Sequence, residues 1–215
     1  MDWSFIISKA PVLAKGAIIT VEITAVTVVA GSVLGLILAL ARFSLWRPVQ
    51  SLASFYTWAF RGTPLLMQLF FIYYGLPQFG LKLAPFPSAV IGLSLNAAAY
   101  IAEIIRAAIK SIDIGQMEAA RSLGMTRGQS MRLIILPQAY RRLLPPMANE
   151  FIALLKDSSL VSTIQMVDLM RTAKLVESST FRPFEIYFLA GLCYLFLTSF
   201  FSVAFGYLEK RVEIA

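Results

Sequence analysis

The sequence predicts an all-α integral membrane protein with about five transmembrane helices. Hydrophobic residues make up 58% of its 215 residues and charged residues only 14%, and the mean hydropathy is +0.73. A water-soluble domain of this length would need more polar side chains to cover its surface. Because about 20 residues cross a bilayer, the chain can hold five spans with short connections. Neither a repeat nor a linker divides it, so residues 1–215 are expected to form a single transmembrane domain.

Residue counts exclude several kinds of site. Histidine is absent, which removes the usual general base, proton relay and metal ligand. Cys193 is the single cysteine and lies in an apolar run, so neither a disulfide framework nor a cysteine metal site is expected. The net charge of +7 would suit a nucleic-acid-binding protein, but the placement of the basic residues argues against that class. No metal and no cofactor are expected in this chain.

The first half of the chain predicts three spans. Residues 1–13 form a short amphipathic lead, and they are expected to be retained because they lack the basic start and cleavage site of a signal peptide. The first span covers about 14–41. The second covers about 52–75 and contains Arg61-Gly62-Thr63-Pro64, whose proline is expected to break the helix. The third covers about 88–109.

The central connection, about residues 113–137, lacks an apolar run of membrane length. Asp113 and Gln116 have the spacing of a capping box at a helix start, and Gly124 is placed to end that helix in the left-handed conformation. Ala119-Ala120 keeps the helix slim enough to enter a groove on another protein. The pattern therefore predicts a helical plug.

A second short helix is expected to follow at once. Thr126 and Gln129 repeat the capping-box spacing, and the helix is expected to continue to Leu136 before Pro137 interrupts it.

The last part of the chain predicts two more spans. The fourth covers about 138–155 and contains Pro145-Pro146, where a break is expected. A polar, partly helical connection covers 156–182, and the fifth span covers about 183–207. Placing the central connection in the cytoplasm puts most of the 19 Lys and Arg residues there as well. The N-terminus is then expected outside and the C-terminus in the cytoplasm.

Several segments resemble a known family. The motif Glu118-Ala119-Ala120, Gly124, Ile134 and Leu136-Pro137 resembles the cytoplasmic loop of the membrane subunits of ABC importers. Four further segments are similar to the polar amino-acid permease branch of these importers, of the histidine, arginine and glutamine type: Phe60–Pro64, Phe70–Pro77, Tyr100–Arg106 and Leu154–Leu160. Together with the central loop, these segments cover most of residues 14–210.

The resemblance implies a type I importer permease fold and a set of partners. These are a second permease copy or close paralogue, two ATPase subunits and an extracytoplasmic solute-binding protein. It also implies that Glu118 orients the coupling helix, that Ala119-Ala120 allows a close fit to the ATPase, and that Gly124 sets the bend. The chain has no G-x-x-x-x-G-K-[ST] phosphate loop. It is therefore expected not to be an enzyme, with ATP and Mg²⁺ bound by the partner.

Polar side chains within the spans are candidates for a substrate site, because such groups are costly at membrane depth. Glu150, beside Asn149, has no basic residue within one helical turn, so the ammonium or guanidinium of an amino acid could neutralise it. An arginine of another span would serve equally. Four weaker candidates, for each of which a helix–helix hydrogen bond is the more ordinary role, are Gln68, Phe71, Asn96 and Tyr100. Glu103 and Arg106 are expected to pair with each other.

These observations predict a permease subunit of an ATP-driven importer in the cytoplasmic membrane, moving polar and in particular basic amino acids by alternating access. Two alternatives stay open. An ion-coupled carrier would also bury carboxylates but would not need the slim cytoplasmic helix pair. A membrane scaffold without a transport role predicts that Glu150→Ala changes stability only.

Overall fold

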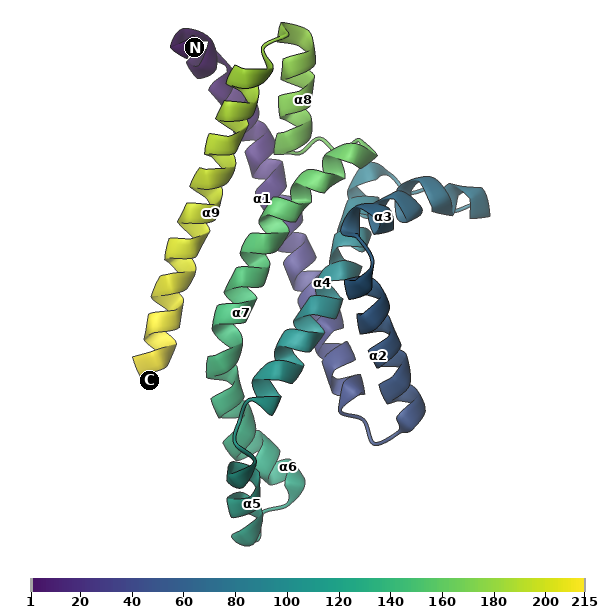
Figure 1. Cartoon of the computed structure of the whole chain (residues 1–215), viewed down its shortest axis with the longest axis vertical. Coiled ribbons are helices and arrows are strands. Elements are labelled where there is room, and N and C mark those ends of the chain that lie inside the picture. The colour runs from purple at the N-terminus through teal and green to yellow at the C-terminus, as the bar shows by residue number, and fades with distance from the viewer. Residues whose placement is uncertain (1, 215) are drawn as a thin grey trace.

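A computed structural model describes residues 2–214, and within that range the chain is built from helices without a strand. In chain order the elements are α1 (Trp3–Arg42), α2 (Arg47–Gly62), α3 (Leu65–Phe70), η1 (Phe71–Gly75), η2 (Leu76–Phe79), α4 (Pro85–Lys110), α5 (Ile114–Ser122), α6 (Arg127–Ser130), η3 (Met131–Ile135), α7 (Leu136–Asp157), η4 (Ser158–Ile164), α8 (Leu169–Thr180) and α9 (Pro183–Ile214). The long helices run along one axis, with α5 and α6 beyond one end and α8 at the other (Figure 1). We refer to these as the α5 end and the α8 end.

The central contact of the bundle is between α1 and α4, and glycines of α1 make it close. A Cβ added at Gly31 would lie 2.9 Å from Ala97 Cβ, and one added at Gly35 would lie 2.8 Å from Ile101 Cγ2. Small residues let membrane helices approach until their backbones nearly touch, which strengthens dispersion contacts where no hydrophobic effect drives association. The path of α4 is therefore fixed against α1.

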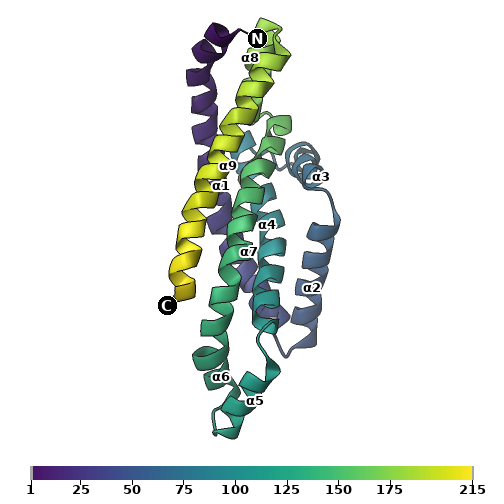
Figure 2. The same cartoon turned by 60° about the vertical axis from the view of Figure 1, so that its left-hand side comes forward.

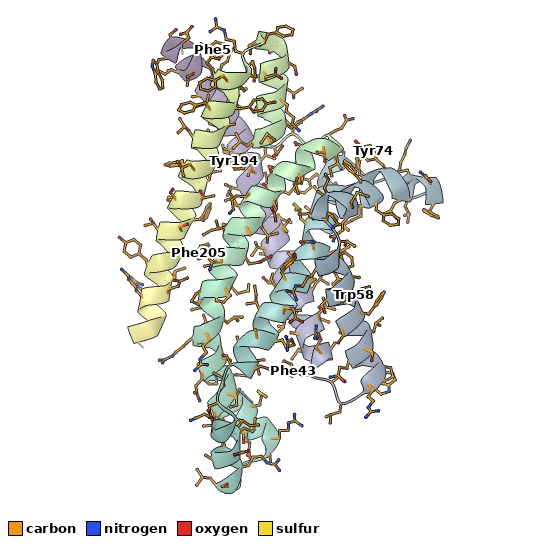
Figure 3. All side chains as sticks on the ribbon, viewed as in Figure 1. Phe5, Phe43, Trp58, Tyr74, Tyr194 and Phe205 are labelled. Atoms are coloured by element: carbon orange, nitrogen blue, oxygen red, sulfur yellow. The ribbon has the colours of Figure 1, made fainter. Side chains whose placement is uncertain are left out.

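Three of the described helices are long and apolar enough to cross a membrane, namely α1, α4 and α9. The expected third and fifth spans are thus confirmed. Much apolar surface faces outward: Trp58 on α2 is 71% exposed and points away from the bundle (Figure 3), and Phe196 on α9 is equally exposed. Such side chains are stable in contact with lipid, which explains how a chain this hydrophobic remains folded.

The first helix is longer than the sequence predicts. It begins at Trp3 rather than near residue 14, so the expected separate lead is wrong. Asp2 caps the helix by accepting a hydrogen bond from the Phe5 N–H. Ile6 and Leu13 are buried against α8 and α9, and this packing stabilises a helix that continues through Pro11.

The second expected span is not one straight helix. It ends at Gly62, the backbone is extended at Thr63 and Pro64, and a new helix starts at Leu65. From there α3, η1 and η2 turn away from the axis of α2 (Figure 2). The break has a chemical basis, because Pro64 has no N–H and the chain leaves carbonyls unpaired. The Gln68 side chain donates to two of them, Phe60 O at 2.8 Å and Thr63 O at 3.1 Å.

The central connection forms the two predicted short helices at the α5 end (Figure 1). Gly124 has the expected positive φ of 83° and lies in the turn between α5 and α6. The capping box of Thr126 and Gln129 is confirmed, with both reciprocal hydrogen bonds present. The box expected at Asp113 is only half formed: Asp113 accepts from Gly115 N–H, whereas the Gln116 amide contacts Gln138 instead.

Two proline breaks expected from the sequence are absent. The π-helix η3 ends at Ile135 and runs directly into α7, which has Pro137 in its first turn. The same helix continues through Pro145 and Pro146. A proline near the start of a helix removes an N–H that would lack a partner anyway. The wider π-turn of η3, just before Pro137, is one of the adjustments that lets a helical run accommodate such a residue.

The connection before the last helix contains α8, whose start is buried. Asp168 caps it, accepting from Arg171 N–H at 2.8 Å and from Met170 N–H at 3.2 Å. The Tyr194 hydroxyl donates to Oδ2, the oxygen that also accepts from Met170, at 3.5 Å. Asp168 lies outside the membrane-spanning helices, and burial raises the pKa of its carboxyl group to about 6, against the lowering effect of these hydrogen bonds.

Candidate functional site

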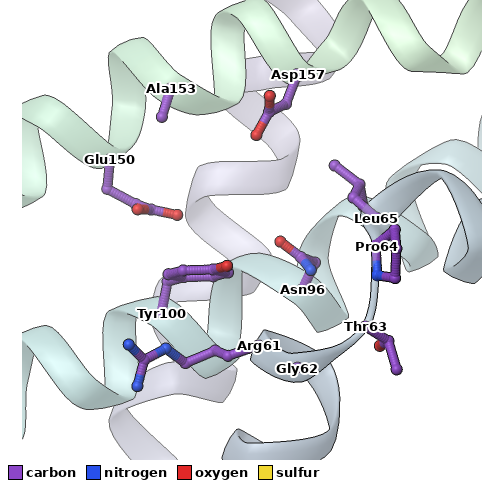
Figure 4. Close-up of a pocket in the computed structure, with 10 residues that line it drawn as sticks. All are labelled: Arg61, Gly62, Thr63, Pro64, Leu65, Asn96, Tyr100, Glu150, Ala153 and Asp157. Atoms are coloured by element: carbon purple, nitrogen blue, oxygen red, sulfur yellow. The ribbon is translucent and has the colours of Figure 1, made fainter.

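A polar cavity of about 440 Å³ lies between the α2–α3 break, α4 and α7 (Figure 4). Its lining comes from three segments: Arg61, Gly62, Thr63, Pro64 and Leu65 at the break, Asn96 and Tyr100 on α4, and Glu150, Ala153 and Asp157 on α7. The break forms one wall of the cavity, because the extended Thr63 and Pro64 are among its lining residues. Irregular backbone at membrane depth is tolerated where it lines such a cavity.

Two carboxylates of α7 point into this cavity (Figure 4). Glu150 and Asp157 are two helical turns apart and so share one face of the helix, with the small Ala153 between them. Glu150 is half-buried, whereas Asp157 is exposed. Within the described part of the chain neither forms an ion pair. With two carboxylates and the single guanidinium of Arg61, the cavity lining therefore carries an excess of negative charge.

Arg61 and Tyr100 lie toward the α5 end of the cavity. The guanidinium carbon of Arg61 lies 5.3 Å from the centre of the Tyr100 ring, a cation–π distance. In the view of Figure 4 the ring stands between the carboxylate of Glu150 and the guanidinium. Arg61 Nη1 is also 3.9 Å from Glu103 Oε2, one turn further along α4.

Glu103 is the centre of a separate ion-pair cluster that joins α1, α2 and α4. Arg106 donates to its Oε2 from Nε at 2.9 Å and from Nη2 at 2.7 Å, as the sequence predicts. Arg42 of α1 donates to the other oxygen, Oε1, and also to Thr57 Oγ1 at 2.6 Å. Both carboxylate oxygens are thus occupied, so this cluster ties helices together and offers no site for a ligand.

Asn96 connects the cavity wall to the α2–α3 break. Its Nδ2 donates to Gln68 Oε1 at 3.1 Å and to Phe60 O at 3.3 Å. Gln68 in turn donates to the backbone of the break. These amides therefore hold the shape of the cavity, and one face of Asn96 still lines it.

The structure brings together three of the six residues expected at a substrate site. Asn96, Tyr100 and Glu150 line the cavity, and Gln68 supports it through Asn96. Phe71 is 61% exposed on η1, and Asn149 is exposed on α7; neither is among the lining residues.

Sequence reasoning missed two charged lining residues, Arg61 and Asp157. The signal for Asp157 was present, because it follows Glu150 by two full helical turns. Arg61 could be linked to the cavity only once the path of the chain after Pro64 was known.

The predicted coupling residues lie on α5 and the turn after it. Glu118 and Ala119 are exposed, whereas Ala120 is only 5% exposed and packs within this chain. The most exposed apolar side chain nearby is Leu123, at 84%. Among residues 2–214, no group of acidic or cysteine side chains could hold a metal ion.

Comparisons with known proteins agree on one family. A family model described as "Binding-protein-dependent transport system inner membrane component" matches residues 31–214. The chain is 41% identical to the arginine transport system permease protein ArtQ of Bacillus subtilis, over 99% of this chain and 98% of the relative. It is 44% identical to the probable glutamine ABC transporter permease protein GlnM of the same organism, over 89% of each chain.

Solved structures agree with the sequence relatives. A crystal structure of an amino acid ABC transporter with histidines matches with a TM-score of 0.95 and 43% identity, covering 98% of this chain and 99% of that one. The MetNI methionine ABC transporter, at 21% identity and a TM-score of 0.79 over 95% of this chain and 98% of that one, shares the fold. The chain therefore belongs to the family of inner membrane components of binding-protein-dependent transport systems, and it is an ABC transporter permease subunit whose relatives are amino-acid permeases.

Proposed function

We propose that this permease imports cationic amino acids and that the cavity between the α2–α3 break, α4 and α7 is its substrate site. The observation that carries the proposal is the pair of carboxylates, Glu150 and Asp157, which face one cavity without an ion-pair partner. Glu150 is half-buried, and a carboxylate withdrawn from water is stabilised by a nearby cation. The guanidinium of arginine or the ammonium of lysine supplies one.

The size and remaining chemistry of the cavity suit an amino acid. Its volume of about 440 Å³ falls within the range of roughly 300–1,000 Å³ that small-molecule sites occupy. Glu150 lies deeper and would receive the cationic side chain or the α-ammonium group. Asn96 and the backbone at Thr63 supply further polar groups for orienting the substrate. Asn149, Gln68 and Phe71 remain weaker candidates, acting through neighbouring lining residues.

The same proposal covers the partners and the orientation. A separate ATPase subunit with ATP and Mg²⁺ would dock at α5, where Glu118 and Ala119 are exposed. A second copy or paralogue would complete the membrane dimer, and an extracytoplasmic binding protein would deliver substrate at the α8 end. The α5 end and the C-terminus would then face the cytoplasm, with the N-terminus outside. The chain would act as one transmembrane domain that alternates between outward-open and inward-open states.

Binding to the purified complex of permease and ATPase tests the substrate site. Isothermal titration calorimetry with arginine, lysine, histidine, glutamine and glutamate should give the tightest binding for arginine or lysine. Glu150→Gln should weaken binding of the cationic amino acids by about tenfold to a hundredfold, because a charge-assisted contact is lost, and should change glutamine binding less.

Glu22→Gln is the matched control, since it also removes one carboxylate but changes an exposed residue of α1 that does not line the cavity. Its affinity should equal that of the wild type. Equal binding of arginine by Glu150→Gln and wild type would overturn the proposed site. Uptake driven by an ion gradient, without a co-purifying ATPase, would favour the ion-coupled carrier.

A further inference from the structure

The guanidinium of Arg61 lies beside the cavity with its hydrogen-bonding capacity unused. Within residues 2–214 it has no hydrogen-bond acceptor, although an arginine carries five N–H donors. Its position is set by the Tyr100 ring, 5.3 Å from the guanidinium carbon. Its side chain is 43% exposed, so the arginine is held by stacking rather than by a salt bridge with hydrogen bonds.

The nearest carboxylate, that of Glu103, forms no hydrogen bond with the Arg61 guanidinium. Glu103 already accepts from Arg106 and Arg42, and Arg61 Nη1 remains at 3.9 Å from it, beyond hydrogen-bonding distance. Three arginines thus surround one carboxylate. The group carries excess positive charge, and the arginine that contributes it is the one that lines the cavity.

The charges that line the cavity leave it with one negative charge. Glu150 and Asp157 contribute two negative charges and Arg61 contributes one positive charge. An amino acid with a cationic side chain carries one net positive charge, so it neutralises the site. Without Arg61 the same cavity would carry two negative charges and would attract a cation more strongly.

We propose that Arg61 is a resident counter-cation that competes with a cationic amino acid for the Glu150 carboxylate and thereby keeps substrate binding weak enough for release. This inference rests on the proposed function, since it concerns the same site. Arg61 lies in the last turn of α2, which ends at Gly62 before the extended Thr63-Pro64 segment, whereas Glu150 belongs to α7. A transition that moves α2 relative to α7 therefore changes how strongly the two charges interact. When they approach, the substrate cation is displaced.

Neutralising Arg61 provides the test, in the purified complex of permease and ATPase. Arg61→Gln should bind arginine about tenfold more tightly than wild type, as removal of one nearby charge in a partly hydrated site predicts. Turnover of arginine in proteoliposomes should fall, because release becomes slow, so both KM and kcat decrease. Binding of glutamine should change much less, since its side chain is neutral.

Three further variants separate charge from shape. Arg61→Lys keeps the charge, so its affinity for arginine should be close to that of the wild type. If the site needed the planar guanidinium of Arg61, lysine would not replace it. Arg47→Gln removes an exposed arginine at the other end of α2 and should leave affinity unchanged. In a Glu150→Gln background, Arg61→Gln should have less effect than in wild type, because the carboxylate for which the two cations compete is gone.

The outcomes distinguish this inference from the proposed function. If wild type binds cationic amino acids and loses affinity with Glu150→Gln, the site stands. If Arg61→Gln then binds arginine with unchanged or weaker affinity, the counter-cation role is overturned. Weaker binding that Arg61→Lys does not rescue would assign Arg61 to the substrate carboxylate instead. If wild type binds no cationic amino acid, the proposed function fails first.

Discussion

The backbone N–H of Leu169, at the start of α8, donates a hydrogen bond of 3.1 Å to Thr20 Oγ1, in the first half of α1. Both residues are fully buried. The first N–H groups of a helix have no partner within it, and here a side chain from a helix 149 residues away in sequence supplies one. Asp168 accepts from the next two. The start of α8 is thus fixed to α1 by specific polar contacts.

Thr20→Val tests this contact with a side chain of nearly the same shape. The variant leaves the buried Leu169 N–H without an acceptor, so the free energy of unfolding should fall by about 1–3 kcal/mol. Thermal denaturation in detergent measures it as a lower Tm. Thr198→Val is the matched control, because Thr198 bonds only to carbonyls of its own helix. A Tm for Thr20→Val equal to that of Thr198→Val would argue against the contact.

Gly16 should tolerate no side chain, because α8 lies directly against it. A Cβ there would lie 2.7 Å from Thr172 Oγ1 and 3.0 Å from the Leu169 backbone, which cannot move independently. Gly16→Ala should destabilise the protein by about 1–3 kcal/mol, as overpacking does. Gly191→Ala, on α9, meets nothing within 4 Å and should be neutral or slightly stabilising in the same Tm measurement.

Asp168 should make stability depend on pH in the direction opposite to most carboxylates. Its pKa is about 6 in the folded protein against a model-compound value of 3.8. The folded state therefore holds the proton more tightly, and stability falls as pH rises from about 4 to about 6 and stays lower above that. The full effect is on the order of 3 kcal/mol.

Asp168→Asn keeps an acceptor that can cap α8 but cannot ionise. Relative to wild type, this variant should gain stability at pH 7.5 and gain little or none at pH 4.5, where wild-type Asp168 is largely protonated. Tyr194 contacts the same side chain, so its hydroxyl is expected to stay hydrogen-bonded in the variant. An equal difference in Tm between variant and wild type at both pH values would contradict the assignment.

Gly124 is expected to control coupling through the shape of the turn between α5 and α6. Its φ is 83°, and a Cβ there would meet no neighbouring atom. Gly124→Ala therefore costs about 1 kcal/mol of backbone strain rather than a clash. In proteoliposomes with the ATPase, the variant should hydrolyse more ATP per amino acid imported.

Gly128→Ala is the control for that experiment, since Gly128 also has open space around it but lies within α6 and lacks a positive φ. Co-purification of the ATPase with both variants establishes assembly. If Gly124→Ala hydrolyses as much ATP per amino acid imported as the wild type does, the turn is a connection only.

Local patterns in the sequence are enough to place several elements. The apolar runs locate α4 and α9, Gly124 and the Thr126 capping box mark their turns, and Glu103 pairs with Arg106 three residues away. Each of these features depends on residues close in sequence, whose geometry is fixed by helix periodicity. The central loop motif also resembles that of ABC importer permeases, and the family model that matches residues 31–214 confirms this family.

Only the tertiary structure decided which of the expected proline breaks form and which charges meet. Pro145 and Pro146 lie within α7, whereas the chain breaks at Pro64. At that break the Phe60 carbonyl accepts from Gln68, which is near in sequence, and from Asn96 of α4, which is distant. Likewise, Arg61 reaches the cavity of Glu150 and Asp157 because the packing of α2, α4 and α7 brings them together.

The sequence by itself determined the class, the fold family and the local turns. The cavity and its balance of charge were decided by contacts between residues far apart in the chain, which no local pattern encodes.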